Sequence, residues 1–542
     1  MTLPALRPTS QQNLTRGYAP ESDAERRRTF AIISHPDAGK TTLTEKILLH
    51  AGALTEAGSV RARRQARSTV SDWMEIERRR GISISSTVLR FESDGWLFNL
   101  VDAPGHADFS EDTYRTLWAV DAALMVVDGT RGLERQTLKL FEVCRRRNLP
   151  IVTFINKCDR PGIEPLALLD EIEQRIGLQP TALAWPVGTD GQLDAIVDLR
   201  NSSVAEIDST AHGATIGTQR LTALDDWRPP AGREKAWQAA QEEIELVQHS
   251  APRADPEAVR AGRLTPVYFG SALTNQGIDV LLDGLTRYMP PPGTMRSLDG
   301  REHPLEGRFG AQVFKVQANL DPRHRDRVAF LRVHNGAFAR GMSVFNTRTG
   351  RRLSLAHSHE MFGQERETIS RAGPGDVVGI VNASGVLLGD TLAEDPALRY
   401  PPIPAFLPEH FAYLRNLDGK RYKSFHSGLR QLDEEGVVRL LRPVSVDGEP
   451  VVGVVGPLQL EVTAERMASE FGCPVRVDTA PYELARWIAQ DAVPVVPVRR
   501  GVLTVVDSAG RHLVLFSNRF TLENVRQAKP DLDLLTEPPA TA

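Results

Sequence analysis

The chain has 542 residues, of which 41% are hydrophobic and 25% charged, and its 65 Lys and Arg against 69 Asp and Glu give a net charge of −4. This composition excludes a strongly basic nucleic-acid-binding tail, and no apolar run reaches the roughly 18 residues that a membrane-spanning helix needs. The 3 cysteines form no Cys-x-x-Cys pair and the N-terminus has no apolar signal segment, so we expect a cytoplasmic protein without disulfides or a membrane anchor.

At roughly 150 residues per domain, the length predicts three or four domains. Residues 1–28 are polar and contain proline and glycine, so we expect a flexible leader. Between residues 29 and 295, apolar runs alternate with amphipathic stretches, which predicts an α/β domain with a doubly wound sheet. The strands that we expect in this domain cover residues 30–34, 96–101, 122–127, 151–155 and 266–269.

A Pro-Pro-Pro-Gly segment at 290–293 indicates a linker to the second half of the chain. Residues 296–400 contain short β-type runs separated by glycines, which predicts a small antiparallel β-barrel. Residues 401–490 fit a βαββαβ module, an α+β (ferredoxin-like) domain, and residues 491–542 are expected to form a C-terminal extension. The helices and strands that we expect there lie at 422–434, 451–455, 459–471, 502–506 and 512–516.

A phosphate-binding loop is predicted between the first expected strand and a helical pattern at 43–50. Gly39 would let backbone N–H groups turn toward a phosphate chain, and the N-terminus of the following helix would add its positive dipole. Lys40 would reach the β and γ phosphates, and Thr41 would bind Mg²⁺. Alternatively, a Gly-Lys-Thr sequence stands at this helix start by chance. The loop residues are Ser34, His35, Pro36, Asp37, Ala38, Gly39, Lys40, Thr41 and Thr42.

Two further segments are expected to face the metal and the γ phosphate. Asp102 follows the strand at 96–101, where a carboxylate would bind a Mg²⁺-held water, and the N–H of Gly105 would contact the γ phosphate. An ordinary turn explains the same residues equally well. Ser83 would ligate Mg²⁺ only while the γ phosphate is bound, as in a switch, although a plain strand start is the alternative.

The guanine base is expected to be recognised by the segment Asn-Lys-Cys-Asp at 156–159. The carboxylate of Asp159 would face the N1–H and 2-amino group of guanine, while Asn156, next to Lys157, would lie near N7 or O6. A backbone N–H of Ser271 or Ala272 would contact O6. Because four motifs occur in this order, each after an expected strand, we infer one GTP/GDP-binding site rather than four unrelated turns.

These residues resemble the translational GTPases, the group that includes elongation factors Tu and G. The shared segments are His-Pro-Asp-Ala-Gly-Lys-Thr-Thr at 35–42, Arg-Gly-Ile-Ser-Ile at 80–84 and Asp-Ala-Pro-Gly-His at 102–106. Within this group the chain is most similar to the peptide chain release factor 3 family. The segments that carry this closer resemblance are Trp-Met-Glu at 73–75, Asp-Pro-Arg-His-Arg-Asp-Arg-Val-Ala-Phe at 321–330 and Gly-Val-Val-Gly-Pro-Leu-Gln at 453–459.

The resemblance implies roles for single residues. His106 corresponds to the histidine that the sarcin–ricin loop of ribosomal RNA pushes toward the attacking water, and Pro36 and Ile82 correspond to the apolar gate that restrains it. Asp37 corresponds to an aspartate near Mg²⁺ and a monovalent ion. Ser83 replaces the threonine of the elongation factors and keeps the hydroxyl ligand.

The resemblance also implies an inserted subdomain at about 180–262 and a cytoplasmic, monomeric, ribosome-dependent GTPase with GTP or GDP and Mg²⁺ as cofactors. Such a protein would promote the dissociation of class I release factors from the ribosome after peptide release. The residues after 490 are too few for the two further domains of elongation factor G, so we do not expect translocation. The basic residues expected to contact ribosomal RNA are Arg323, Arg325, Arg327, Arg351 and Arg352.

Two other functions remain open. The chain is compatible with another translational GTPase, which would rescue or protect ribosomes or act like elongation factor G. It is also compatible with a GTP-regulated module whose domains only bind other proteins. The arginines at 61, 63, 64 and 67 suggest an RNA contact or a solvated surface more than a catalytic arginine.

Overall fold

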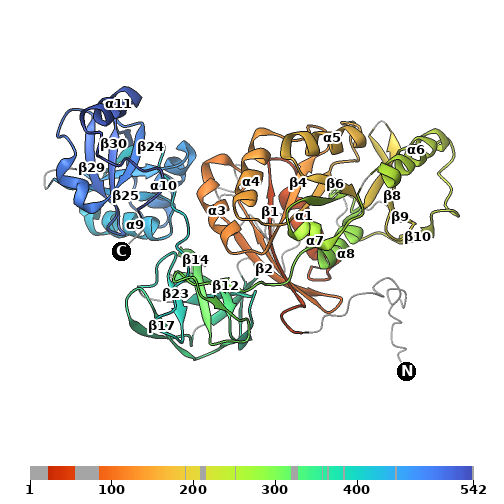
Figure 1. Ribbon diagram of the computed structural model, residues 1–542, viewed down its shortest axis with the longest axis horizontal. Coiled ribbons are helices and arrows are strands. Elements are labelled where there is room, and N and C mark those ends of the chain that lie inside the picture. The colour runs from red at the N-terminus through yellow and green to blue at the C-terminus, as the bar shows by residue number, and fades with distance from the viewer. Residues whose placement is uncertain are drawn as a thin grey trace.

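The computed structural model folds the chain into an N-terminal α/β unit, a β-barrel beneath it, and a C-terminal α+β unit next to helix α3 (Ser110–Trp118) (Figure 1). The inserted strands and helix α6 (Glu234–Ser250) lie at the opposite end of the α/β unit. The structure describes residues 22–54, 85–189, 191–207, 215–250, 252–318, 327–356, 358–362, 365–381, 385–445 and 449–539.

The N-terminal unit is built on a twisted sheet in the order β2-β3-β1-β4-β5-β11-β6. All neighbouring strands run parallel except β2 and β3, which pair antiparallel. The strands are β1 (Arg27–Ser34), β2 (Thr87–Ser93), β3 (Trp96–Asp102), β4 (Ala122–Asp128), β5 (Ile151–Asn156), β6 (Gln179–Ala182) and β11 (Leu264–Phe269). The five expected strands are therefore present, and β2 and β6 were not predicted.

Helices cover both faces of this sheet, as the alternation along β1 requires. Phe30 and Ile32 face one apolar core, and Ala31 and Ile33 face the other, all at most 1% exposed. The first core holds α1 (Lys40–His50) and α8 (Ile278–Tyr288), and the second holds α3, α4 (Arg135–Arg146) and α5 (Pro165–Ile176). In the part of the chain that the structure describes, no helix is both long and apolar enough to cross a lipid bilayer.

The structure corrects the expected end of the leader at residue 28, because β1 already begins at Arg27. Both arginines are buried: Arg28 donates to the carbonyl of Thr286 in α8 and lies 4.4 Å above the ring of Trp96. Arg27 pairs with Asp376 of the barrel at 3.0 Å. Because these partners lie far away in the sequence, the run of arginines could be read only as a solvated segment before the structure was known.

The expected insertion forms a subdomain with its own sheet in the order β10-β9-β8-β7. Its strands are β7 (Ala184–Thr189), β8 (Gln192–Asp198), β9 (Ser203–Ile207) and β10 (Gln219–Ala223). Helix α6 packs on β7, where Trp185 donates to Glu243 at 3.1 Å, and α7 (Pro256–Arg260) leads back to β11. The separate sheet begins after β6, since residues 179–182 still pair with β11 in the central sheet.

The second unit is an antiparallel barrel, as expected, with strands in the order β18-β17-β23-β14-β15-β22-β19. Alternate apolar side chains fill its interior. The strands are β12 (Met295–Arg296), β13 (Glu302–His303), β14 (Gly310–Ala318), β15 (Arg327–Asn335), β16 (Phe338–Ala339), β17 (Ser343–Asn346), β18 (Arg351–Ser354), β19 (Ser358–Phe362), β20 (Glu365–Thr368), β21 (Arg371–Ala372), β22 (Val377–Val381) and β23 (Thr391–Ala393).

The third unit begins with a βαββαβ module whose strands lie in the order β27-β24-β26-β25, and β29, β30 and β28 extend the same sheet. The expected boundary at residue 490 therefore falls between β28 and its partner β30, so residues 491–516 are part of this unit and not an extension. The elements are β24 (His410–Asn416), α9 (Tyr422–Glu434), β25 (Arg439–Pro443), β26 (Val451–Val454), α10 (Pro457–Ser469), β27 (Val475–Thr479), β28 (Leu484–Ile488), β29 (Val502–Val506), β30 (His512–Phe516) and α11 (Arg519–Ala528).

Candidate functional site

The four motif segments follow the strands β1, β3, β5 and β11, and these strands run parallel. The carboxyl ends of parallel strands meet at one edge of a sheet, which is where ligands bind in folds of this class. The contacts between the segments show how closely they approach.

The segment between β1 and α1 forms a tight loop. Its backbone turns at Asp37 (φ 66°) and Gly39 (φ 93°), and both angles lie in the left-handed region. Two features of Gly39 require a glycine: its left-handed backbone angle, and the fact that a Cβ at this position would overlap Nδ2 of Asn156. Lys40 and Thr41 open helix α1, so the free N–H groups of its first turn face the loop. This is the backbone arrangement that binds phosphate.

The loop meets the segment after β3 through an ion pair. Nζ of Lys40 lies 2.6 Å from Oδ1 of Asp102, and both side chains are buried. Gly105 approaches the backbone of Pro36, since a Cβ at Gly105 would lie 3.8 Å from the Cα of Pro36. The predicted phosphate-binding and metal-binding residues thus lie side by side.

Asn156, at the end of β5, joins three segments. Its Nδ2 donates to the carbonyl of Ala38 at 2.8 Å, and its Oδ1 accepts from the N–H of Ala272 at 2.9 Å. In this structure the amide ties the phosphate loop to the Ser-Ala segment, and its expected position near N7 or O6 of a guanine stays a prediction.

Lys157 links the same region to a residue that the sequence did not single out. Its Nζ donates to the carbonyl of Asp37 at 2.6 Å and to Oδ2 of Asp128 at 2.7 Å. Burial of Asp128 opposes its ionisation, but the hydrogen bonds from Lys157 and Thr130 outweigh it and lower the pKa of this carboxyl. Asp128 ends strand β4 just as Asp102 ends β3, and this parallel position is the signal that could have identified it.

Asp159 is the residue expected to read the guanine base. Among the described residues, its buried Oδ1 has no hydrogen-bond partner, and an unsatisfied buried acceptor is costly unless a ligand completes it. The nearby Ser271 is fully buried and donates its N–H to the carbonyl of Gln276 at 3.0 Å. The carboxylate of Asp159 therefore has room for hydrogen-bond donors, and the N1–H and 2-amino group of guanine are donors of this kind.

His106 directly precedes the short 3₁₀ helix that leads into α3, and its side chain is 36% exposed. Its Nδ1 is 3.2 Å from Oδ1 of Asp108, which the sequence did not single out. In the phosphate loop, Nε2 of His35 contacts Glu134 at 2.6 Å, another residue without a motif signal. Both carboxylates hold an imidazole of the site in place.

Several predicted residues lie outside the described part of the chain: Ile82, Ser83, the arginines at 61, 63, 64 and 67, Arg323 and Arg325. Among the described candidates for RNA contact, Arg327 pairs with Glu434 of the C-terminal unit at 2.9 Å, so it is engaged within the protein. Arg351 and Arg352 are exposed on β18.

Comparisons with known proteins agree along the whole chain. Family models match the elongation factor Tu GTP binding domain at residues 25–291, elongation factor G domain 2 at 308–395, and the class II release factor RF3 C-terminal domain at 400–526. The chain is 46% identical over 518 residues to peptide chain release factor 3 of Cyanothece sp. (strain PCC 7425), which covers 95% of this chain and 96% of the relative.

A second relative, peptide chain release factor 3 of Synechococcus elongatus, is 46% identical over 525 residues, covering 96% of this chain and 94% of its own length. A crystal structure of a protein from Thermus thermophilus has a TM-score of 0.68 at 24% identity. The superposition covers 89% of this chain and 72% of the Thermus thermophilus chain, so the two proteins share the fold.

Proposed function

The chain belongs to the peptide chain release factor 3 family of translational GTPases, and from this premise we propose that it promotes the dissociation of class I release factors from the ribosome after peptide release. The observation that supports the proposal most is that the phosphate loop contacts the segments at 102–106 and 156–159, and that Asn156 in turn contacts the segment at 271–272. A single bound nucleotide can therefore contact all four segments.

GTP and GDP are selected by the base-reading residues. The buried Oδ1 of Asp159 supports guanine because adenine presents no pair of donors at the same place. Asn156 acts by holding the phosphate loop and the Ser-Ala segment in register, so a bound base would meet a preformed surface. The backbone N–H groups of Ser271 and Ala272 now donate to the carbonyl of Gln276 and to Oδ1 of Asn156, so either would have to leave its partner to reach the O6 edge.

The phosphates and the metal are held by the loop of 34–42 together with Asp102. Lys40 would exchange its present partner, Asp102, for the β and γ phosphates. The residues that would hold Mg²⁺ are Thr41 and Ser83, with Asp102 bound through water. Bound Mg²⁺ would neutralise the charge of the phosphates.

His106 would orient the attacking water. Its partial exposure supports an approach by an external element, and we propose that the sarcin–ricin loop of the ribosome supplies it. Turnover is then slow on the free protein and fast on the ribosome. We further propose that the protein acts as a monomer in the cytoplasm and that Arg351 and Arg352 contact ribosomal RNA.

The test of the overall function uses ribosomes that have released their peptide and still carry a fluorescent class I release factor. We expect the protein with GTP to accelerate loss of the fluorescent factor, because the GTP state favours a ribosome conformation that binds it weakly. The control is the same protein without nucleotide. An unchanged dissociation rate with GTP would contradict the proposal and favour a different translational GTPase.

The role of His106 is tested by His106→Ala. We expect GTP and GDP affinity to stay at the wild-type value, and ribosome-stimulated hydrolysis to fall on the order of 10²–10⁴-fold, since a group that positions or deprotonates water contributes about that much. Hydrolysis is measured in single turnover with and without ribosomes. Absence of ribosome stimulation in the wild-type protein would instead indicate a GTP-regulated binding module.

A further inference from the structure

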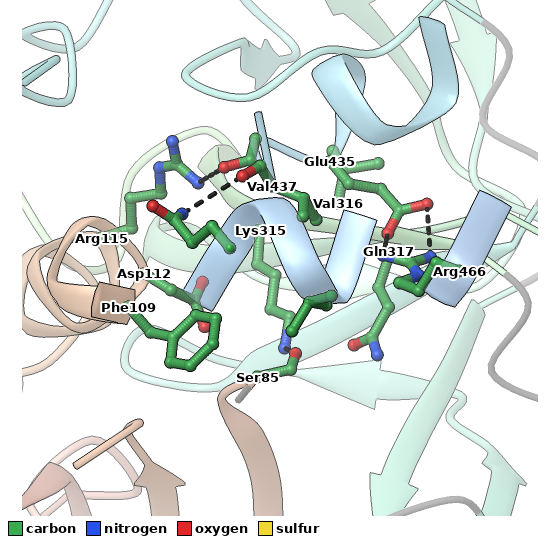
Figure 2. A pocket seen from close by; sticks show the side chains of 13 residues that line it. Ser85, Phe109, Asp112, Arg115, Lys315, Val316, Gln317, Glu435, Val437 and Arg466 are labelled. Carbon is green, nitrogen blue, oxygen red and sulfur yellow. Dashed lines mark hydrogen bonds and ion pairs between the residues drawn. The ribbon is translucent and has the colours of Figure 1, made fainter. Parts of the chain in front are cut away.

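The three units meet around a cavity of about 50 Å³, shown in Figure 2. Phe109, Asp112 and Arg115 reach it from the α/β unit, Lys315 from the barrel, and Glu435 and Arg466 from the C-terminal unit. The segment that leads from His106 into α3 therefore packs directly against both other units. Its contact with the C-terminal unit passes through residues next to the proposed catalytic histidine.

That contact is made by the segment Gly-Pro-Leu-Gln at 456–459, part of a motif that the nucleotide site does not use. The N–H of Leu458, in the first turn of α10, donates to Oδ2 of Asp108 at 2.7 Å. Gln459 occupies the N–H groups of Val455 and Gly456, at 2.8 and 3.0 Å. The positive end of the α10 dipole also faces the carboxylate of Asp108.

Gly456 is needed for this approach. A Cβ at this position would overlap the Cα, Cβ and Cγ of Asp108, although the backbone angle of φ −133° at Gly456 suits any residue. The glycine is thus explained by the closeness of the two units and not by its conformation. Arg439 of the C-terminal unit supports the same interface, because it pairs with Glu111 at 3.3 Å and is held by Asp507 of its own unit at 3.2 Å.

The other oxygen of the same carboxylate faces His106. Oδ1 of Asp108 lies 3.2 Å from Nδ1 of His106, and the backbone N–H of Asp108 lies 3.2 Å from the same nitrogen. The hydrogen bond of the structure runs from the backbone N–H of Asp108 to Nδ1, which accepts it, while Oδ1 lies at ion-pair distance from the same nitrogen. When the proton sits on Nδ1, the carboxylate stabilises it there by its charge, and Nε2 is left as an acceptor able to receive a proton or hydrogen bond from water.

We propose that Asp108 is a positioning residue that couples the docking of α10 to the orientation and tautomer of His106. One carboxylate oxygen is fixed by the C-terminal unit, and the other fixes the imidazole. The position of the C-terminal unit therefore sets how well His106 can act on the water. The inference rests on the proposed role of His106 and adds the residue through which the third unit controls it.

The first test is Asp108→Asn. The amide oxygen can still accept from Leu458, but its NH₂ group would face Nδ1 and favour the tautomer that carries the proton on Nε2. We expect kcat for ribosome-stimulated GTP hydrolysis to fall at least about tenfold, while the KM for ribosomes and the affinity for fluorescent GDP stay within about twofold of wild type. A residue that only stabilises the fold would not separate kcat from KM in this way.

The second test is Gly456→Ala, which displaces Asp108 from the other unit. We expect the same loss of kcat with unchanged GDP affinity, which reports that the α/β unit is folded, and with unchanged resistance to proteolysis, which reports that the C-terminal unit is folded. The matched control is Glu434→Gln, which removes the negative charge from the 2.9 Å ion pair between Glu434 and Arg327 of the barrel but does not touch Asp108. We expect this control to keep the wild-type kcat.

A double-mutant cycle separates the inference from the function on which it rests. In the His106→Ala background, Asp108→Asn should cause no further loss, because both residues act through one imidazole. If His106→Ala alone retains stimulated hydrolysis, the proposed role of His106 fails. If His106→Ala is impaired but Asp108→Asn and Gly456→Ala keep the wild-type kcat, or Asp108→Asn still lowers it without His106, the coupling through Asp108 is refuted.

Discussion

At the scale of single residues, the site is defined by which polar atoms are already engaged. The amide of Asn156 joins two loops through one N–H and its oxygen, and Lys157 holds Asp37 and Asp128. The buried Oδ1 of Asp159 stands apart, because within the described ranges it has no hydrogen-bond donor. The motif at 156–159 thus combines Asn156 and Lys157, which hold the loops together, with Asp159, which is available to a ligand.

This difference predicts the effect of Asp159→Asn. The amide would present its NH₂ group to the N1–H and 2-amino donors of guanine, so GDP affinity should fall by about 1–3 kcal/mol, the cost of an unsatisfied buried polar group. A base with an oxygen at position 2, such as xanthine, should bind the variant better than it binds the wild type. Titration with fluorescent GDP and XDP checks this, and equal GDP affinity in both proteins would contradict the assignment.

At the scale of elements, the C-terminal hairpin is decisive for its unit. Strand β30 pairs with both β28 and β29, and β29 pairs with β25 of the βαββαβ module. The hairpin also buries the fully inaccessible Trp487 of β28 in a core with Val505, Leu513 and Leu515. A segment with ordinary β-type runs therefore completes a sheet that begins almost a hundred residues earlier.

Truncation after residue 490 should consequently unfold more than the removed segment. Strand β25 would keep β26 but become an open edge, β28 would lose its sheet partner β30, and the core around Trp487 would be exposed. We expect aggregation, or rapid proteolysis of the remaining C-terminal unit, while the α/β unit still binds GDP. Truncation after residue 536 serves as the control and should leave the sheet protected, because it keeps Leu535, which exchanges backbone hydrogen bonds with Trp487 at 3.0 and 2.9 Å.

At the scale of the whole molecule, buried charges fix the barrel against the α/β unit. Arg27 of β1 and Asp376 of the barrel are 7% and 0% exposed and lie 3.0 Å apart. Asp376 also accepts from Asn99 of β3 at 3.2 Å, and the hydroxyl of Thr29 donates to the carbonyl of Gly375 at 2.6 Å. The edge of the sheet opposite the nucleotide loops is therefore tied to the second unit.

Asp376→Asn should loosen this interface. Among the described residues, Arg27 would keep the exposed Asp23 as its one acidic partner, and breaking one side of a buried pair costs about 3–5 kcal/mol. We expect a lower thermal unfolding midpoint and faster proteolysis in the linker near residues 290–300. Glu92→Gln removes an exposed pair with Arg26 and should change the stability by less than about 1 kcal/mol; an equal effect of both variants would contradict the role of Asp376.

The sequence by itself determined the family, the order of the three units and the strand-to-loop positions of the nucleotide motifs. These features depend on local patterns: alternating apolar runs, glycines in turns, and motif residues directly after strands such as β1 and β3. Residues 422–434 illustrate this, because their helical pattern became α9 with the same bounds.

Only the tertiary structure decided which distant residues meet. Nothing local distinguishes Arg27 from a solvated arginine, Asp108 from a helix-start carboxylate, or residues 502–516 from an appended hairpin. Their partners, Asp376, Leu458 and β28, lie far along the chain. Burial and charge pairing belong to pairs of residues in space, so their energies become visible only when packing brings both members together.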